Sequence, residues 1–171
     1  MLQLIENEYA HYYKPYIDTL VADEKSIVEY LKDTLDDAIG VLGNLPKDKQ
    51  MYSYADGKWT IKELLQHIID TERVFAYRAL RFARNDTTPL PGFEQDDYAA
   101  IYNANNRDYK ELLEEFEFTR KSIILLFKSF GNDELMRIGI ASGNKMSVRA
   151  LGYIISGHLQ HHLNIISVRY L

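Results

Sequence analysis

Two histidines in the C-terminal segment, His158 and His162, have the spacing of a metal-binding pair. Side chains four residues apart lie about 40° apart on an α-helix, because each residue turns the helix by about 100°. Both histidines share a sector with Leu151 and Ile155, so we expect them to face the protein interior. Burial disfavours the charged imidazole, and two neutral imidazoles one turn apart can clamp a metal ion. The alternative interpretation is a pair of core or interface histidines that bind no metal.

A third metal ligand would have to come from elsewhere in the sequence. His67 is the best candidate, because it lies about 120° from the centre of the apolar face of a predicted helix and could face a neighbouring helix. A lone histidine at such a margin is otherwise a surface or capping residue. His161 follows His158 by three residues but points toward the helix flank. It could support a ligand from behind or simply cover the flank.

The surrounding residues restrict the metal chemistry. The run His158-Leu-Gln-His161-His162 lacks the glutamate that follows the first histidine in zinc proteases. Paired Glu-x-x-His turns of di-iron bundles do not occur, and the chain has no cysteine for thiolate sites. A site of two histidines and one carboxylate is possible in principle, but no carboxylate is well placed beside the pair. Three neutral histidines would leave the full charge of a divalent ion and an open position, which acidify a bound water or thiol.

Glu72 is an acidic residue within the apolar sector of the predicted helix that carries His67. It lies about 140° from His67 and therefore cannot ligate beside it. A buried carboxylate must be paired. One interpretation is an ion pair with an arginine such as Arg73, Arg78 or Arg120. The other is a hydrogen bond from an imidazole N–H of the last helix, which would orient a metal ligand from behind.

Four amphipathic segments must position these residues. Apolar residues recur at spacings of three and four in the segments from about Asp23 to Leu42, Thr60 to Arg84, Asn106 to Phe130 and Ser147 almost to Leu171. A shorter tract from Glu6 to Leu20 could also be helical, and residues 136–145 could form a short strand or hairpin. We therefore predict an all-α four-helix bundle in a single domain over residues 1–171. The connections are long, so the topology need not be simple up-down-up-down.

The composition excludes several classes of protein. The chain has 171 residues, 46% of them hydrophobic and 26% charged, with a net charge of −5, so it is neither disordered nor low in complexity. A mildly acidic chain without a basic block is poorly suited to nucleic acid. We find no long apolar run and no signal peptide within Met1–Leu20. We therefore expect a cytoplasmic protein with neither nucleic-acid nor membrane partners.

Several stretches of the sequence are typical of one family. They are Lys58-Trp-Thr-Ile-Lys-Glu-Leu-Leu-Gln-His67-Ile-Ile-Asp-Thr-Glu72-Arg73, then Arg78, then Leu90-Pro-Gly-Phe93, and finally Gly157-His158-Leu-Gln-His161-His162-Leu-Asn. Together they resemble the DinB/YfiT-like metalloenzyme superfamily. The resemblance runs from about Asp23 to the C-terminus, which is nearly the whole chain.

The resemblance implies a four-helix bundle, often a homodimer, with a divalent metal such as zinc or nickel. Its three ligands carry over to His67, His158 and His162, with no departure from the family pattern. The activities of the family are diverse. Some members resemble transferases that use a low-molecular-weight thiol, and others have been suggested to be metal-dependent hydrolases or isomerases.

From these observations we predict a metal-dependent enzyme acting on a small molecule, with a thiol-dependent S-transferase as the main interpretation. The metal would hold the thiol of the cosubstrate as a thiolate, which is the nucleophile. The alternatives are a hydrolase in which the same metal activates water, and a non-catalytic, stress-related bundle that binds a metal or ligand. Glu72 and His161 are candidates for support behind the ligands, and no catalytic residue is assigned.

Overall fold

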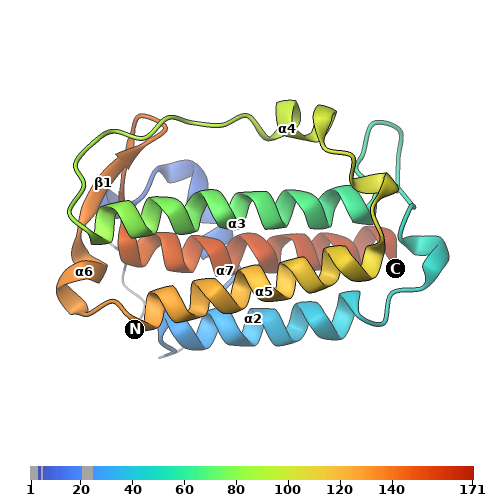
Figure 1. Ribbon diagram of the computed structural model, residues 1–171, viewed down its shortest axis with the longest axis horizontal. Coiled ribbons are helices and arrows are strands. Elements are labelled where there is room, and N and C mark those ends of the chain that lie inside the picture. The colour runs from blue at the N-terminus through green and yellow to red at the C-terminus, as the bar shows by residue number, and fades with distance from the viewer. Residues whose placement is uncertain (1–3, 5, 21–24) are drawn as a thin grey trace.

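The computed structural model describes residue 4 and residues 6–20 and 25–171, and its long helices form a four-helix bundle (Figure 1). The bundle helices are α2 (Ile27–Leu42), α3 (Ile61–Ala83), α5 (Tyr109–Lys128) and α7 (Val148–Ile165). Each one matches a segment predicted from the apolar spacing, so the all-α bundle is confirmed. The expected start of the first helix at Asp23 lies outside the described residues.

Side-chain caps explain where the bundle helices begin. The hydroxyl of Thr60 accepts a hydrogen bond from the backbone N–H of Glu63 at 3.2 Å, and the Glu63 carboxylate accepts one from the backbone of Thr60 at 2.8 Å. This reciprocal pair satisfies two of the donors left free at a helix N-terminus. Ser26 and Glu29 form the same reciprocal pair at α2, and the side chains of Asp108 and Ser147 accept backbone hydrogen bonds at the starts of α5 and α7.

The order of the helices around the bundle differs from their order in the chain. Helix α2 packs on α5 and α7, and α3 packs on the same two helices, so α2 and α3 occupy opposite corners. Helices α2 and α7 run in one direction, and α3 and α5 run in the other (Figure 1). Because α3 and α5 are parallel neighbours, residues 84–108 must return along the length of the bundle. We call this segment the crossover. The topology is therefore not up-down-up-down.

A β-hairpin precedes the last helix, within the tract where an extended conformation was expected. Strands β1 (Ile138–Ala141) and β2 (Asn144–Ser147) pair antiparallel. Ser142 and Gly143 form the turn, with φ of 51° and 74°, as a tight hairpin turn requires. Leu90 of the crossover forms a bridge to β1 at Ala141. The hairpin thus holds the first part of the crossover.

Shorter elements complete the described chain. The tract expected to be helical before the bundle consists of η1 (Glu6–Glu8), η2 (His11–Tyr13) and α1 (Lys14–Ile17), with Pro15 in the first turn of α1. The others are η3 (Lys47–Lys49), α4 (Gln95–Ile101), η4 (Ala104–Asn106), α6 (Asn132–Met136) and the π-helical turn η5 (Ile166–Tyr170). Helices α4 and α6 were not predicted.

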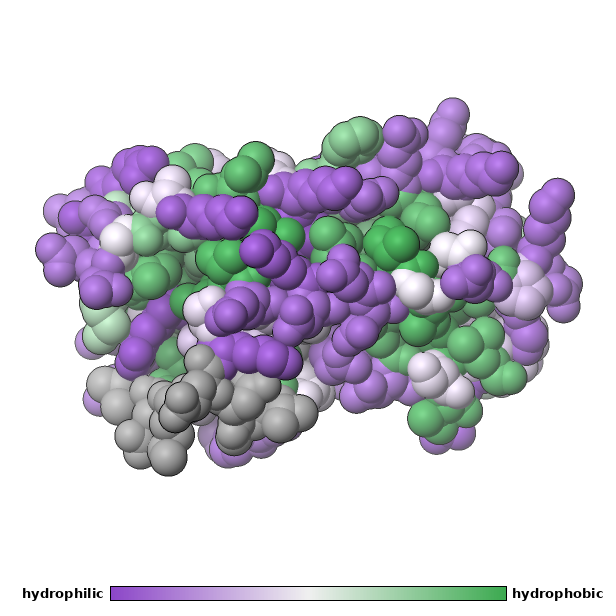
Figure 2. Space-filling view, turned by 90° about the horizontal axis from the view of Figure 1, so that it is seen from below, coloured by the Kyte–Doolittle hydropathy of each residue, from purple (hydrophilic) through white to green (hydrophobic). Residues whose placement is uncertain are grey.

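The apolar faces of the four bundle helices meet in one hydrophobic core. Helix α2 shows the pattern, with Leu31, Leu35, Ala38 and Leu42 buried inside. On the face of the molecule seen in Figure 2, hydrophilic residues run between smaller hydrophobic patches. No helix in the described part of the chain combines the length and apolarity needed to cross a bilayer.

Candidate metal centre

Three histidines from two helices direct their Nε2 atoms to one point. The Nε2 atom of His158 lies 3.1 Å from that of His67 and 3.0 Å from that of His162. All three residues offer ligand atoms within 4.8 Å of one another, and all three are buried. Zinc–nitrogen bonds of about 2.0–2.1 Å in tetrahedral geometry would place such atoms about 3.3 Å apart. The structure therefore brings together the three predicted ligands in an arrangement that fits a divalent metal.

Burial keeps these imidazoles neutral. It lowers the pKa of His67 to about 4. The pKa values of His158 and His162 lie well below the usual range, first because of burial and then because of the neighbouring imidazoles. A neutral imidazole that offers its Nε2 lone pair carries its proton on Nδ1. The three side chains are thus held in the protonation state that metal ligation requires.

Metal-free protein should lose stability as the pH falls from about 7.5 to about 4. Between the ordinary histidine pKa of 6.5 and the folded-state value of about 4 for His67, the unfolded chain binds more protons than the folded chain, so acid favours unfolding. His67 alone should contribute about 3 kcal/mol to this loss. Urea unfolding of chelator-treated wild type and of His67→Gln measures it. Equal pH dependence in the two proteins would contradict the depressed pKa.

Aromatic residues enclose the cluster on the side of α3. The Trp59 ring lies 4.8 Å from the His67 ring, measured between centroids. The carbonyl of Trp59 accepts a hydrogen bond from the Tyr170 hydroxyl at 2.7 Å, and the Lys49 ammonium donates to the carbonyl of Tyr170 at 2.6 Å. The turn at the end of the described chain, η5, therefore fixes the tryptophan against His67.

Helix α1 packs tightly on α7 next to the cluster. A Cβ at Gly157 would lie only 2.1 Å from the carbonyl oxygen of Tyr16, so glycine is what permits this approach. The hydroxyl of Thr19 donates to the carbonyl of Gly157 at 3.2 Å. As a result the Tyr16 ring lies 5.2 Å from the ring of His158, in an edge-to-face contact.

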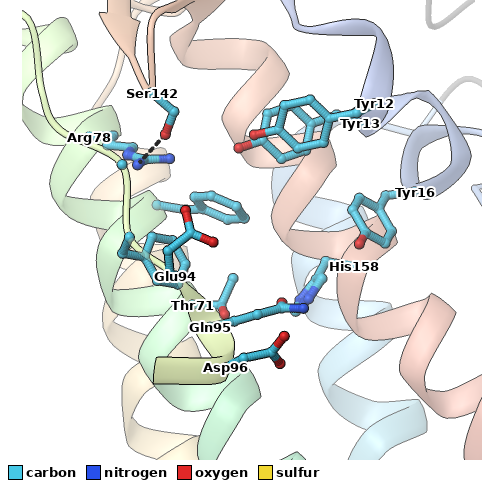
Figure 3. Close-up of a pocket in the computed structure, with 13 residues that line it drawn as sticks. Tyr12, Tyr13, Tyr16, Thr71, Arg78, Glu94, Gln95, Asp96, Ser142 and His158 are labelled. Atoms are coloured by element: carbon cyan, nitrogen blue, oxygen red, sulfur yellow. Dashed lines mark hydrogen bonds between the residues drawn. The ribbon is translucent and has the colours of Figure 1, made fainter. Parts of the chain in front are cut away.

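Two cavities reach the histidine cluster. The first, of about 400 Å³, is lined by His158, Tyr16 and Thr71 among others (Figure 3). The second, of about 330 Å³, is lined by His162 and Trp59. Gln95 and Asp96, at the start of α4 in the crossover, line both cavities. The crossover therefore stands over the cluster, and its side chains face any molecule that approaches the histidines.

Glu72 is buried and paired with Arg120, which confirms the ion-pair interpretation. Its Oε2 atom accepts from Arg120 Nε at 3.0 Å, and its Oε1 atom accepts from Arg120 Nη2. It makes no hydrogen bond to an imidazole in the described part of the chain, where the buried Nδ1 of His162 has no partner. Burial raises the pKa of Glu72, and the charge of Arg120 opposes that shift.

His161 lies beside the cluster without joining it. It is partly exposed and contacts Tyr16 and His162, each with a centroid distance of 5.3 Å. This position on the helix flank is the one its place in the sequence suggests. Burial lowers its pKa as well, but it is not one of the converging ligands.

Several residues that surround the cluster were not identified from the sequence. Thr71 and Arg78 follow His67 by four and eleven residues, which puts all three on one face of α3, so helical spacing could have found them. Tyr16 and Asp96 come from segments far away in the sequence, and no local pattern marks them. Arg78 was one of the arginines considered as partners of Glu72, but it does not pair with it. It is buried and contacts the crossover and the hairpin.

Comparison with known proteins agrees with the fold. The model of the DinB superfamily matches residues 30–166. A curated protein of Oceanobacillus iheyensis, named "Putative metal-dependent hydrolase OB0413", is 26% identical over 149 residues, which cover 84% of this chain and 85% of that protein. The solved structure of YfiT from Bacillus subtilis, described as "a probable metal-dependent hydrolase with an unusual four-helix bundle topology", superposes with a TM-score of 0.68 at 14% identity, over 96% of this chain and 89% of that one.

Proposed function

The chain belongs to the DinB superfamily, and on this premise we propose that it is a metal-dependent hydrolase whose divalent ion is held by His67, His158 and His162. The observation that carries the proposal is the convergence of three buried, neutral imidazoles beside an open cavity. The name of the Oceanobacillus relative supports hydrolysis. Bound there, zinc or nickel would act as a Lewis acid and lower the pKa of water.

The surrounding side chains have separate tasks in this proposal. Burial raises the pKa of the Tyr16 hydroxyl, so Tyr16 remains a hydrogen-bond donor for an oxygen that gains negative charge. Asp96 shares the cavity with His158 (Figure 3), and its carboxylate would accept the proton of the attacking water. Phe75 and Tyr13 line the cavity and would provide an apolar wall for the part of the substrate that does not react.

Hydrolysis replaces thiol transfer as the main proposal. The relative whose name states a reaction is called a hydrolase, and no described residue singles out a thiol as cosubstrate. Thiol transfer and a non-catalytic binding bundle therefore remain as outcomes of the test. A small-molecule substrate and a homodimeric state stay predictions.

A single assay separates these functions. Protein loaded with zinc or nickel should hydrolyse activated esters or amides without added thiol, because the nucleophile is water. His67→Ala should fall to the rate of the buffer, whereas His161→Ala, a neighbouring histidine outside the cluster, should retain most of the activity. Turnover only in the presence of a thiol such as cysteine would indicate a transferase. Metal binding without turnover across the panel would indicate a binding bundle.

A further inference from the structure

Arg78 is a buried cation without an anionic partner in the described part of the chain. Its side chain is 2% exposed. The Nη2 atom donates to the carbonyl of Pro91 and to the hydroxyl of Ser142, both at 3.1 Å, while Nη1 has no hydrogen-bond partner. The guanidinium carbon lies 5.7 Å from the Phe75 ring and 5.8 Å from the Phe93 ring, measured to the ring centroids. A buried charge is costly unless it is paired, so the unpartnered Nη1 favours the binding of an anion here.

A second unpartnered donor lies between Arg78 and the histidine cluster. The Oγ1 atom of Thr71 is buried and has no hydrogen-bond partner among the residues that the structure describes. Thr71 and Arg78 line the same cavity as His158 (Figure 3). Along α3 the α-carbons of His67 and Arg78 are about 16 Å apart, from a rise of about 1.5 Å per residue. The cavity thus has the proposed metal centre at one end and a buried cation at the other.

We propose that this cavity binds the carboxylate of an organic acid, which accepts hydrogen bonds from Arg78 Nη1 and Thr71 Oγ1. The inference rests on the proposed hydrolase function and names its substrate class: a small acyl compound that carries a free carboxylate at a distance from the bond to be cleaved. Guanidinium N–H groups match the two oxygens of a carboxylate. A dianionic phosphate fits less well, because Glu94 and Asp96 also line this cavity and would repel the second charge.

A matched pair of probes tests the site without the metal. The full-length protein, treated with chelator so that no acid can bind through a metal, is titrated calorimetrically with 3-phenylpropionate and with the uncharged 3-phenylpropionamide. The acid should bind at least about tenfold more tightly, since hydrogen bonds to charged groups contribute about 1.5–3 kcal/mol. Arg78→Gln should remove this preference, and Arg78→Lys should retain part of it. Arg73→Gln, on the same helix but half-exposed, is the control and should not change it.

Thr71→Val keeps the test valid if the Arg78 variants fold poorly. Valine has the shape of threonine without the hydroxyl, and Thr71 Oγ1 bonds to nothing in the structure. The variant should bind the acid several-fold more weakly with an unchanged or higher melting temperature. Equal affinity for acid and amide in the wild type would overturn the inference, as would tighter binding of phenyl phosphate.

The outcomes distinguish this inference from the proposed function. If the wild-type protein binds the acid and the amide equally but hydrolyses uncharged esters with bound metal, only the carboxylate site is overturned. A clear acid preference in a protein that binds metal and hydrolyses nothing would overturn only the hydrolase. Retention of the acid preference in Arg78→Gln would place the anion elsewhere and contradict the role of Arg78.

Discussion

Replacing His158 with alanine should remove the bound metal while the bundle stays folded. The Nε2 atom of His158 lies within 3.1 Å of both other imidazole Nε2 atoms, so its loss leaves two ligands on separate helices. The affinity for zinc should fall by more than the roughly 10–100-fold that is typical of changes outside the coordination sphere. Elemental analysis of protein purified without a histidine tag, followed by competition with a chelator, measures both the stoichiometry and the affinity.

His161→Ala is the matched control for this variant, because it removes an imidazole from the same helix that contacts His162 but is not one of the three converging histidines. This variant should retain about one metal ion per chain, because all three histidines of the cluster remain. Full metal content in His158→Ala would contradict the three-histidine site. A wild-type protein that binds neither zinc, nickel nor manganese after reconstitution would make the histidines packing residues and remove the basis of the hydrolase proposal.

Glu72→Gln should lower the free energy of unfolding by about 3–5 kcal/mol, the typical cost of breaking a buried ion pair from one side. The guanidinium of Arg120 on α5 is fully buried and pairs with Glu72 on α3. It also donates to the hydroxyl of Thr34 on α2 at 2.8 Å and to the carbonyl of Ile155 on α7 at 3.5 Å. One arginine therefore joins all four bundle helices. Urea unfolding monitored by circular dichroism measures the loss.

A surface pair provides the control for this experiment. Arg73 contacts Glu115 at 2.7 Å with half of its side chain exposed, so Arg73→Gln should cost less than about 1 kcal/mol. The double variant Glu72→Leu with Arg120→Leu should be less destabilised than the sum of the two single variants, because no unpaired charge remains. A loss below 1 kcal/mol in Glu72→Gln would contradict a structural role for the buried pair.

Local features of the sequence were enough to predict the helices and the inward-facing histidine pair of the last helix. The start of α3 follows from Thr60 and Glu63, whose reciprocal capping needs only neighbouring residues. The same is true of His158 and His162, which face inward because helical geometry places them on the apolar stripe. Helical position also made His67 the best candidate for a third ligand, although a surface or capping role stayed open, and the family resemblance favoured the ligand interpretation.

Contacts between distant segments could not be predicted in this way. The ion pair of Glu72 was one of several options until the packing of α3 against α5 selected Arg120. The burial of Arg78 depends on the crossover and the hairpin, which approach it from residues 13 and 64 positions away. Helix periodicity reports which face is buried, but it does not report which neighbour covers that face.

The crossover has a consequence for how such proteins diversify. The proposed ligands lie on two core helices, whereas part of the cavity wall comes from a segment that the topology obliges every bundle of this kind to carry. Mutations at the exposed crossover residues Glu94, Gln95 and Asp96 can alter the shape and charge of the wall without changing the histidines or the core. In the proposed enzyme, the reaction and the choice of substrate would therefore depend on separate parts of the chain, and grafting this segment between relatives would test whether specificity can be exchanged without changing the three histidines.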